Sequence, residues 1–301
     1  MQRHPSLHVL EHLPDGGGPP GGPMVVLVHG SLDRATSFAR VVRRLGDLHV
    51  VTYDRRGYHR SRPAGGQAGD GRALEGHIED LLDVISQRPA AVVGHSFGGD
   101  VALGAALASP RCVLAVGAYE PPMPWLDWWP RRGVREQAHE GPEEQAESFF
   151  RRVVSDEAWE RLPEHARAER RADGLALVSE LAALRSGKAP FDLSELAVPA
   201  VLGRGELSIP HHRRAVDALQ ALIPDAQVVE IPGASHGAHL SHPDAFARFV
   251  RVVVELPSTR RPAEPDTQRP ERTTNKFRVD GARDERVEDD GPATVPGGFE
   301  G

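Results

Sequence analysis

The sequence predicts an α/β fold in which helices flank a mostly parallel sheet. Short apolar segments rich in Val, Ala and Leu alternate with helix-like segments along most of the chain. Such alternation is typical of parallel strands joined by helical crossovers. The first 256 residues suffice for one large α/β domain that carries an insertion.

The individual elements follow from their apolar patterns. We expect strands near 7–13, 24–28, 49–53, 90–94, 113–119, 198–202 and 226–231. We expect helices over 37–45, 74–86, 97–108, 215–222 and 243–256. In the second of these helices Leu74, Ile78 and Leu81 recur at helical spacing, which indicates a face packed on the core.

Two segments depart from the alternation. Residues 121–190 are rich in charged residues and alanine with helical spacing and contain all four tryptophans, which predicts a helical insertion. The core is then 1–120 and 191–256. Residues 257–301 hold 8 basic, 10 acidic and only five large apolar side chains. Burial of so few apolar side chains cannot offset the conformational entropy that the segment would lose on folding. This tail is therefore predicted to be disordered.

Composition narrows the function classes. A net charge of −7 gives no basic field for nucleic acid or an anionic membrane surface. No run approaches the 18 apolar residues of a membrane span, and the first residues lack the apolar stretch of a secretion signal. The single Cys112 forms no internal disulfide. We therefore expect a cytoplasmic protein that acts on a small molecule.

The most informative segment is Gly94-His95-Ser96-Phe97-Gly98, which lies between a predicted strand and a predicted helix. A serine there is forced onto a sharp turn with its Oγ exposed at the carboxyl end of the sheet. The glycines two before and two after it permit the close approach of strand and helix. Phe97 opens the helix, so its N–H is free to stabilise an oxyanion.

Two further motifs accompany this turn. Residues 24–28 form a strand-like run that leads into His29-Gly30-Ser31, and Tyr53 is followed by Asp54-Arg55-Arg56-Gly57. With the serine motif, they make the chain resemble the α/β-hydrolase superfamily. The resemblance implies that Ser31 supplies the second oxyanion N–H and that 121–190 form a helical cap over the active site. It implies structural roles for His29 and the Asp54–Gly57 turn, and no cofactor or metal.

The resemblance also implies a catalytic base. The last predicted strand is followed by Gly233-Ala234-Ser235-His236-Gly237, which matches the family's loop for the catalytic histidine. The histidine follows the serine in the chain, as this fold requires. His239 and His242 lie nearby, but only His236 has the matching surroundings.

Two glutamates compete for the role of the acid. The family's usual acid follows the sixth strand, where Glu206 lies three residues after Gly203 and four before Pro210. In a subset of the superfamily the acid follows the preceding strand, where this chain has Glu120. We favour Glu120, because a carboxylate that ends a buried strand requires a partner and the two prolines after it fix the backbone. Glu206 remains the alternative.

These residues predict a serine hydrolase for a small ester or related acyl compound, with Ser96 as nucleophile, His236 as base and Glu120 orienting it. We expect one or two of Trp125, Trp128 and Trp129 to line an apolar substrate pocket. Within the superfamily the alternatives are a carbon–carbon bond hydrolase, a lactonase, a cofactor-free haloperoxidase-type enzyme or a proline-iminopeptidase-like enzyme. The alternative from a different function class is a non-catalytic binding protein of the same fold. A serine at position 96 excludes chemistry that needs an aspartate nucleophile there.

Overall fold

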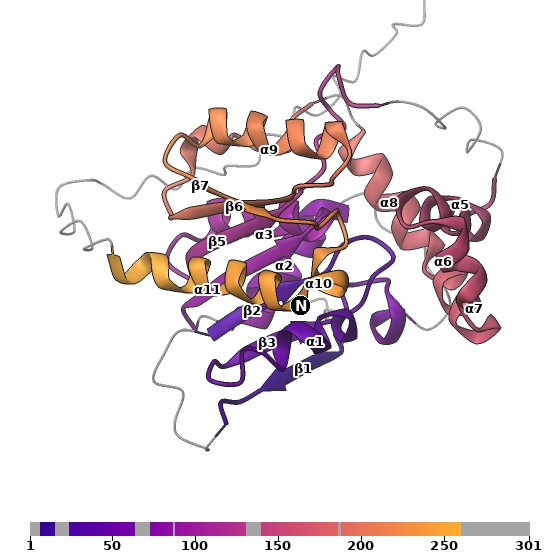
Figure 1. Cartoon of the computed structure of the whole chain (residues 1–301), viewed down its shortest axis with the longest axis horizontal. Coiled ribbons are helices and arrows are strands. Elements are labelled where there is room, and N and C mark those ends of the chain that lie inside the picture. The colour runs from indigo at the N-terminus through magenta and orange to yellow at the C-terminus, as the bar shows by residue number, and fades with distance from the viewer. Residues whose placement is uncertain are drawn as a thin grey trace, which may run out of the picture. The chain divides into compact units, whose positions relative to one another are not determined.

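A seven-stranded sheet forms the centre of the computed structural model, which describes residues 7–15, 24–63, 73–86, 88–130, 140–185 and 188–259 (Figure 1). The strands are β1 (Val9–His12), β2 (Met24–Val28), β3 (Val50–Tyr53), β4 (Ala90–His95), β5 (Val113–Tyr119), β6 (Ala200–Gly205) and β7 (Gln227–Ile231). Their order in the sheet is β1-β3-β2-β4-β5-β6-β7. Only β1 is antiparallel to its neighbour, so the predicted mostly parallel α/β fold is confirmed.

The central strands are apolar throughout because helices cover both faces of the sheet. Along β2, Val26 and Val28 join the core on one face, whereas Val25 and Leu27 join the core on the other. The first core lies against α2 (Ala73–Ile85), α3 (Phe97–Ala108) and α9 (Pro210–Leu222). The second lies against η1 (Ala35–Phe38), α1 (Ala39–Val42), α10 (Ala238–Ser241) and α11 (Pro243–Thr259). Two short 3₁₀ turns lie in the connections between these elements: η2 (His59–Ser61) follows β3, and η3 (Leu193–Glu195) precedes β6.

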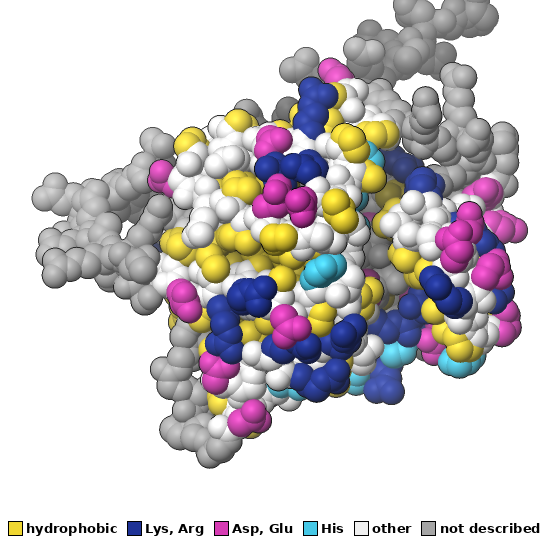
Figure 2. All heavy atoms as spheres, viewed as in Figure 1, with side chains coloured by type: hydrophobic (Ala, Val, Ile, Leu, Met, Phe, Trp, Pro, Cys, Tyr) yellow, Lys and Arg dark blue, Asp and Glu magenta, His cyan; other side chains and the backbone are white. Residues whose placement is uncertain are grey.

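Among the described residues between β5 and β6 there are four α-helices: α5 (Pro142–Val153), α6 (Asp156–Arg161), α7 (Glu164–Ala172) and α8 (Gly174–Leu184). We call them the insert; they are the predicted helical insertion. Acidic and basic side chains are interspersed on its exposed surface (Figure 2), and Glu147 pairs with both Arg151 and Arg171 at 2.7 Å.

A small apolar cluster joins the insert to the core. Leu32 and Tyr58 of the core pack with Ala146 and Leu177 of the insert. The turn before Tyr58 also approaches α8 closely: a Cβ on Gly57 would lie 2.7 Å from the Ala176 methyl, and Gly57 has a φ of +81°. Only glycine meets both conditions without strain.

Several boundaries differ from those predicted. The helix expected over 215–222 begins at Pro210, which is well suited to a first helical position because its fixed φ is helical and its missing N–H is not needed there. The helix expected over 37–45 is η1 followed by α1, which ends at Val42. α11 continues to Thr259, so the first three residues of the predicted tail are helical. Residues 260–301, and the disorder predicted for them, lie outside the described residues. Among those described, no helix is long and apolar enough to cross a membrane.

Candidate active site

Ser96 lies on a strained turn between β4 and α3. Its backbone has φ 54° and ψ −129°, a conformation that L-residues rarely adopt. A Cβ on Gly94 would overlap the carbonyl of Gly98, and a Cβ on Gly98 would overlap the carbonyl of Val28. The two glycines flanking Ser96 are therefore required by the close packing of β2, β4 and α3.

The loop after β2 passes directly beside this turn. A Cβ on Gly30 would lie 2.9 Å from Ser96 Cβ, so the next residue, Ser31, belongs to the loop that faces the nucleophile turn. Phe97, the other predicted oxyanion donor, is the first residue of α3. N–H groups at a helix start have no partner within the helix, which leaves the Phe97 N–H suited to an anion.

His236 follows β7 and forms a hydrogen bond from Nδ1 to Glu120 Oε2 at 2.8 Å. Its backbone carbonyl accepts a hydrogen bond from His95 Nε2, also at 2.8 Å. Because His95 directly precedes Ser96, this bond fixes the histidine loop to the nucleophile turn. With Nδ1 donating to the carboxylate, Nε2 of His236 is left unprotonated and able to accept a proton.

Glu120 follows β5, whose neighbour in the sheet is β4, and it too has a positive φ, 47°. Its side chain is fully buried. Oε1 accepts a hydrogen bond from the Gly205 N–H at 2.8 Å. Oε2 accepts one from His236 Nδ1 at 2.8 Å and one from His212 Nδ1 at 3.1 Å. Burial opposes ionisation, yet these hydrogen bonds outweigh it and hold the pKa of Glu120 well below its usual range.

The alternative acid, Glu206, has a different environment. Its exposed carboxylate accepts the backbone N–H of Gly233 at 2.8 Å. That contact fixes the turn that leads to His236, three residues before the histidine itself. The structure therefore brings Glu120, and not Glu206, to His236.

The sequence alone did not single out His212, the second histidine on Glu120. It lies in the first turn of α9, and its ring is 4.2 Å from that of His236, centroid to centroid. The available signal was Pro210, which starts a helix at the carboxyl edge of the sheet and places the following residues there.

The basicity of His236 is reduced by its surroundings. Burial is the main cause, the neighbouring His212 adds to it, and Glu120 opposes both, so the pKa of His236 is lowered to about 4. At neutral pH the imidazole is therefore uncharged, which is the state a general base requires.

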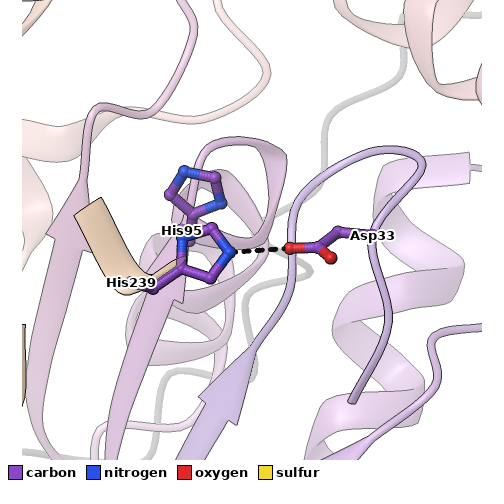
Figure 3. A group of neighbouring side chains, drawn as sticks. All are labelled: Asp33, His95 and His239. Atoms are coloured by element: carbon purple, nitrogen blue, oxygen red, sulfur yellow. Dashed lines mark hydrogen bonds and ion pairs between the residues drawn. The ribbon is translucent and has the colours of Figure 1, made fainter. Parts of the chain in front are cut away.

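A second histidine–carboxylate group lies beside the first. Asp33, His95 and His239 come from three different elements, and Asp33 Oδ2 is 3.0 Å from His239 Nε2 (Figure 3). The His95 ring packs on His239 at 4.3 Å. In the Glu120 group both imidazoles bond to the carboxylate, whereas in this group only His239 does and His95 Nε2 bonds to the His236 carbonyl. We assign a metal to neither group.

A buried ion pair connects the insert to the loop beside Ser96. Glu180 of α8 is 1% exposed and accepts hydrogen bonds from Arg55 Nη1 at 2.5 Å, Tyr58 Oη at 2.7 Å and Ser31 Oγ at 2.6 Å. Arg55 also donates from Nη2 to the Gly30 carbonyl at 3.1 Å. Burial opposes ionisation of Glu180, but Arg55 outweighs it and lowers the pKa of that carboxyl.

Replacement of Glu180 with alanine is expected to cost about 3–5 kcal/mol of unfolding free energy, because it leaves the Arg55 guanidinium buried without its counter-ion. Urea denaturation measures the loss. Asp47→Ala, which removes an exposed pair with Arg251, is the control and should cost about 0–1 kcal/mol. A similar small loss for both variants would contradict a structural role for Glu180.

The three tryptophans predicted to line a pocket lie in different environments. Trp125 is 9% exposed within the main core. The Trp128 ring lies 4.4 Å below the Arg214 guanidinium. Trp129 stacks on His212 at 5.8 Å with an interplanar angle of 25°, so of the three it is the one in contact with the group around Glu120.

A sequence model described as the alpha/beta hydrolase family matches residues 25–249, three quarters of the chain. The chain belongs to the α/β-hydrolase family. A pimeloyl-[acyl-carrier protein] methyl ester esterase of Yersinia pseudotuberculosis is 28% identical over 252 residues, which cover 77% of this α/β-hydrolase and 93% of the esterase.

Two other proteins show how far the similarity extends. Epoxide hydrolase A of Mycobacterium tuberculosis is 37% identical over 108 residues, 35% of this chain and 34% of that protein's length. The crystal structure of the enol-lactonase from Burkholderia xenovorans superposes with a TM-score of 0.62 at 22% identity, covering 82% of this α/β-hydrolase and 95% of the lactonase. At that identity the likeness concerns the fold alone.

Proposed function

We propose that this α/β-hydrolase is a serine hydrolase that cleaves a small ester or related acyl substrate. The observation that carries the proposal is the hydrogen bond between His236 Nδ1 and the buried Glu120 carboxylate, which lies beside the strained turn of Ser96. A histidine held in this tautomer by a carboxylate is the arrangement that activates a serine.

The steps assign one role to each residue. Ser96 Oγ attacks the carbonyl carbon of the substrate while His236 Nε2 takes the hydroxyl proton of Ser96. The oxyanion that forms accepts hydrogen bonds from the backbone N–H groups of Ser31 and Phe97. Collapse of the tetrahedral intermediate expels the alcohol, which takes its proton from His236. Water, activated by the same histidine, then releases the acid. Glu120 stabilises the imidazolium in both halves.

The relatives favour an ester over an epoxide. The esterase relative aligns with most of this chain, whereas the epoxide hydrolase aligns with about a third of it. Opening an epoxide through an alkyl-enzyme needs a carboxylate nucleophile, and this chain has Ser96 on the nucleophile turn.

A fluorophosphonate probe and a series of p-nitrophenyl esters of graded acyl length test the proposal. The probe should label one serine, and at least one ester should turn over at a rate that the probe abolishes. Absence of both labelling and turnover would favour the non-catalytic alternative.

The activity is expected to persist into acid. Since the pKa of His236 is lowered to about 4, the base stays unprotonated down to roughly pH 5, and kcat/KM should fall with a midpoint near pH 4. A pH series of kcat/KM measures this, and samples returned to neutral pH show whether acid has unfolded the protein. A reversible midpoint at or above the ordinary histidine value would contradict the lowered pKa.

A further inference from the structure

We propose that His212 is a positioning residue of this reaction: it holds the Glu120 carboxylate and competes with His236 for the same carboxylate oxygen. The inference rests on the proposed function, because it concerns how strongly Glu120 supports His236 as the base.

The contacts of Glu120 carry the inference. Oε2 accepts two imidazole N–H groups, from His236 at 2.8 Å and from His212 at 3.1 Å, while Oε1 accepts the Gly205 N–H. The three donors come from three separate parts of the chain, so the carboxylate cannot rotate without losing one of them. The imidazole of His212 thus does for Glu120 what Glu120 does for His236.

The His212 ring is itself held in place. One side stacks on Trp129 at an interplanar angle of 25°, and the His236 ring lies 4.2 Å away. His212 is 9% exposed, so its hydrogen bond to Glu120 is largely shielded from water. A shielded bond to a carboxylate is stronger than one at the surface.

Sharing one oxygen has a consequence for His236. Each N–H takes part of the negative charge on Oε2, so less of it is left to stabilise the His236 imidazolium. The other titratable groups facing His236 are His95 at the end of β4 and His239 on α10, whose own partner is Asp33. His211 lies next to His212 at 4.6 Å. Among these described residues, His212 alone shares the carboxylate oxygen of Glu120 with His236.

Two substitutions separate the hydrogen bond of His212 from the packing of its ring. His212→Phe keeps an aromatic ring against Trp129 and removes the N–H that bonds to Glu120. His212→Asn retains an amide N–H near the position of Nδ1 but removes the ring that packs on Trp129. His211→Asn is the matched control, because His211 also contacts Trp129, at 4.8 Å. Kinetics are followed with the best p-nitrophenyl ester across a pH series, and thermal melts show that each variant is folded.

His212→Phe is expected to lower kcat about tenfold at pH 8 with KM within about twofold, by analogy with the partners that orient metal ligands, whose loss typically costs 10- to 100-fold. The acid midpoint of kcat/KM should rise by about half to one pH unit, because Glu120 then supports His236 alone. His212→Asn should retain kcat within about threefold and keep the midpoint within about 0.3 pH unit of the parent value, because its amide N–H still shares Oε2 of Glu120. His211→Asn should match the parent in both.

If His212→Phe loses kcat while the acid midpoint of kcat/KM stays the same, His212 only supports packing. If neither kcat nor the midpoint changes, His212 has no role in the reaction. Either result overturns the inference, as does a midpoint that falls. If His212→Phe does not fold, His212→Leu, which also removes the N–H, is measured in its place. Failure of the proposed function is recognised separately, by the parent protein giving neither probe labelling nor turnover.

Discussion

Replacement of Ser96 with alanine is expected to abolish fluorophosphonate labelling and to lower ester turnover by roughly 10³-fold or more. The proposed acyl-enzyme forms on Ser96 Oγ, and no other atom of the turn can replace it. The residual rate reflects substrate binding and the oxyanion N–H groups. A 10³-fold loss corresponds to about 4 kcal/mol of transition-state stabilisation.

Labelling kinetics, turnover and thermal melts of the Ser96→Ala protein test this expectation. The melting temperature should change little, because Ser96 is only half-buried and alanine keeps its Cβ. Ser241→Ala serves as the control, since this exposed serine on α10 bonds to Gly237 and His242. It should label like the parent. Undiminished labelling of Ser96→Ala would show that the nucleophile is another residue.

The sequence predicted the fold well where buried strands are apolar on both faces, as in β2 and β4. It placed the start of α9 five residues late. The first turn of that helix, from Pro210 to Arg214, is polar except for the proline, so the apolar periodicity begins only at Ala215. A polar first turn at the edge of the sheet is also what allows His212 to reach Glu120.

The site was predictable to the extent that its signals are local. Ser96 and His236 each lie in a short motif of glycines and small residues. The partners of these residues lie far along the chain: Glu120 is 116 residues before His236 and 92 before His212, and Ser31 is 149 before Glu180. Such contacts depend on strand order and loop geometry, which a periodic pattern does not contain.

The choice between the two glutamates shows this limit. β6 lies between β5 and β7, so Glu120 and Glu206 both follow strands close to the loop of His236. Sequence spacing fits either residue. The difference is backbone conformation: the positive φ of Glu120 accompanies a carboxylate buried against His236, whereas Glu206 bonds to the Gly233 N–H at the surface.

Replacement of Glu120 with glutamine is expected to lower kcat by up to roughly 10⁴-fold, by analogy with the loss of a triad carboxylate. The amide has nearly the same shape but cannot balance the His236 imidazolium. Its NH₂ group can also favour the wrong imidazole tautomer by donating to Nδ1. A neutral side chain removes the negative charge that both His236 and His212 contact.

Glu206→Gln is the matched control for this test, because it makes the same chemical change in a carboxylate that bonds to a backbone N–H. It should cost less than about tenfold in kcat, since its effect on His236 passes through the turn at Gly233. The two variants are compared by kcat and probe-labelling rate at pH 8, with melting temperatures to detect misfolding. If Glu206→Gln lost activity and Glu120→Gln kept it, the acid would follow β6 as in most of the family. The three hydrogen bonds on Glu120 would then serve only to hold β5, β6 and α9 together.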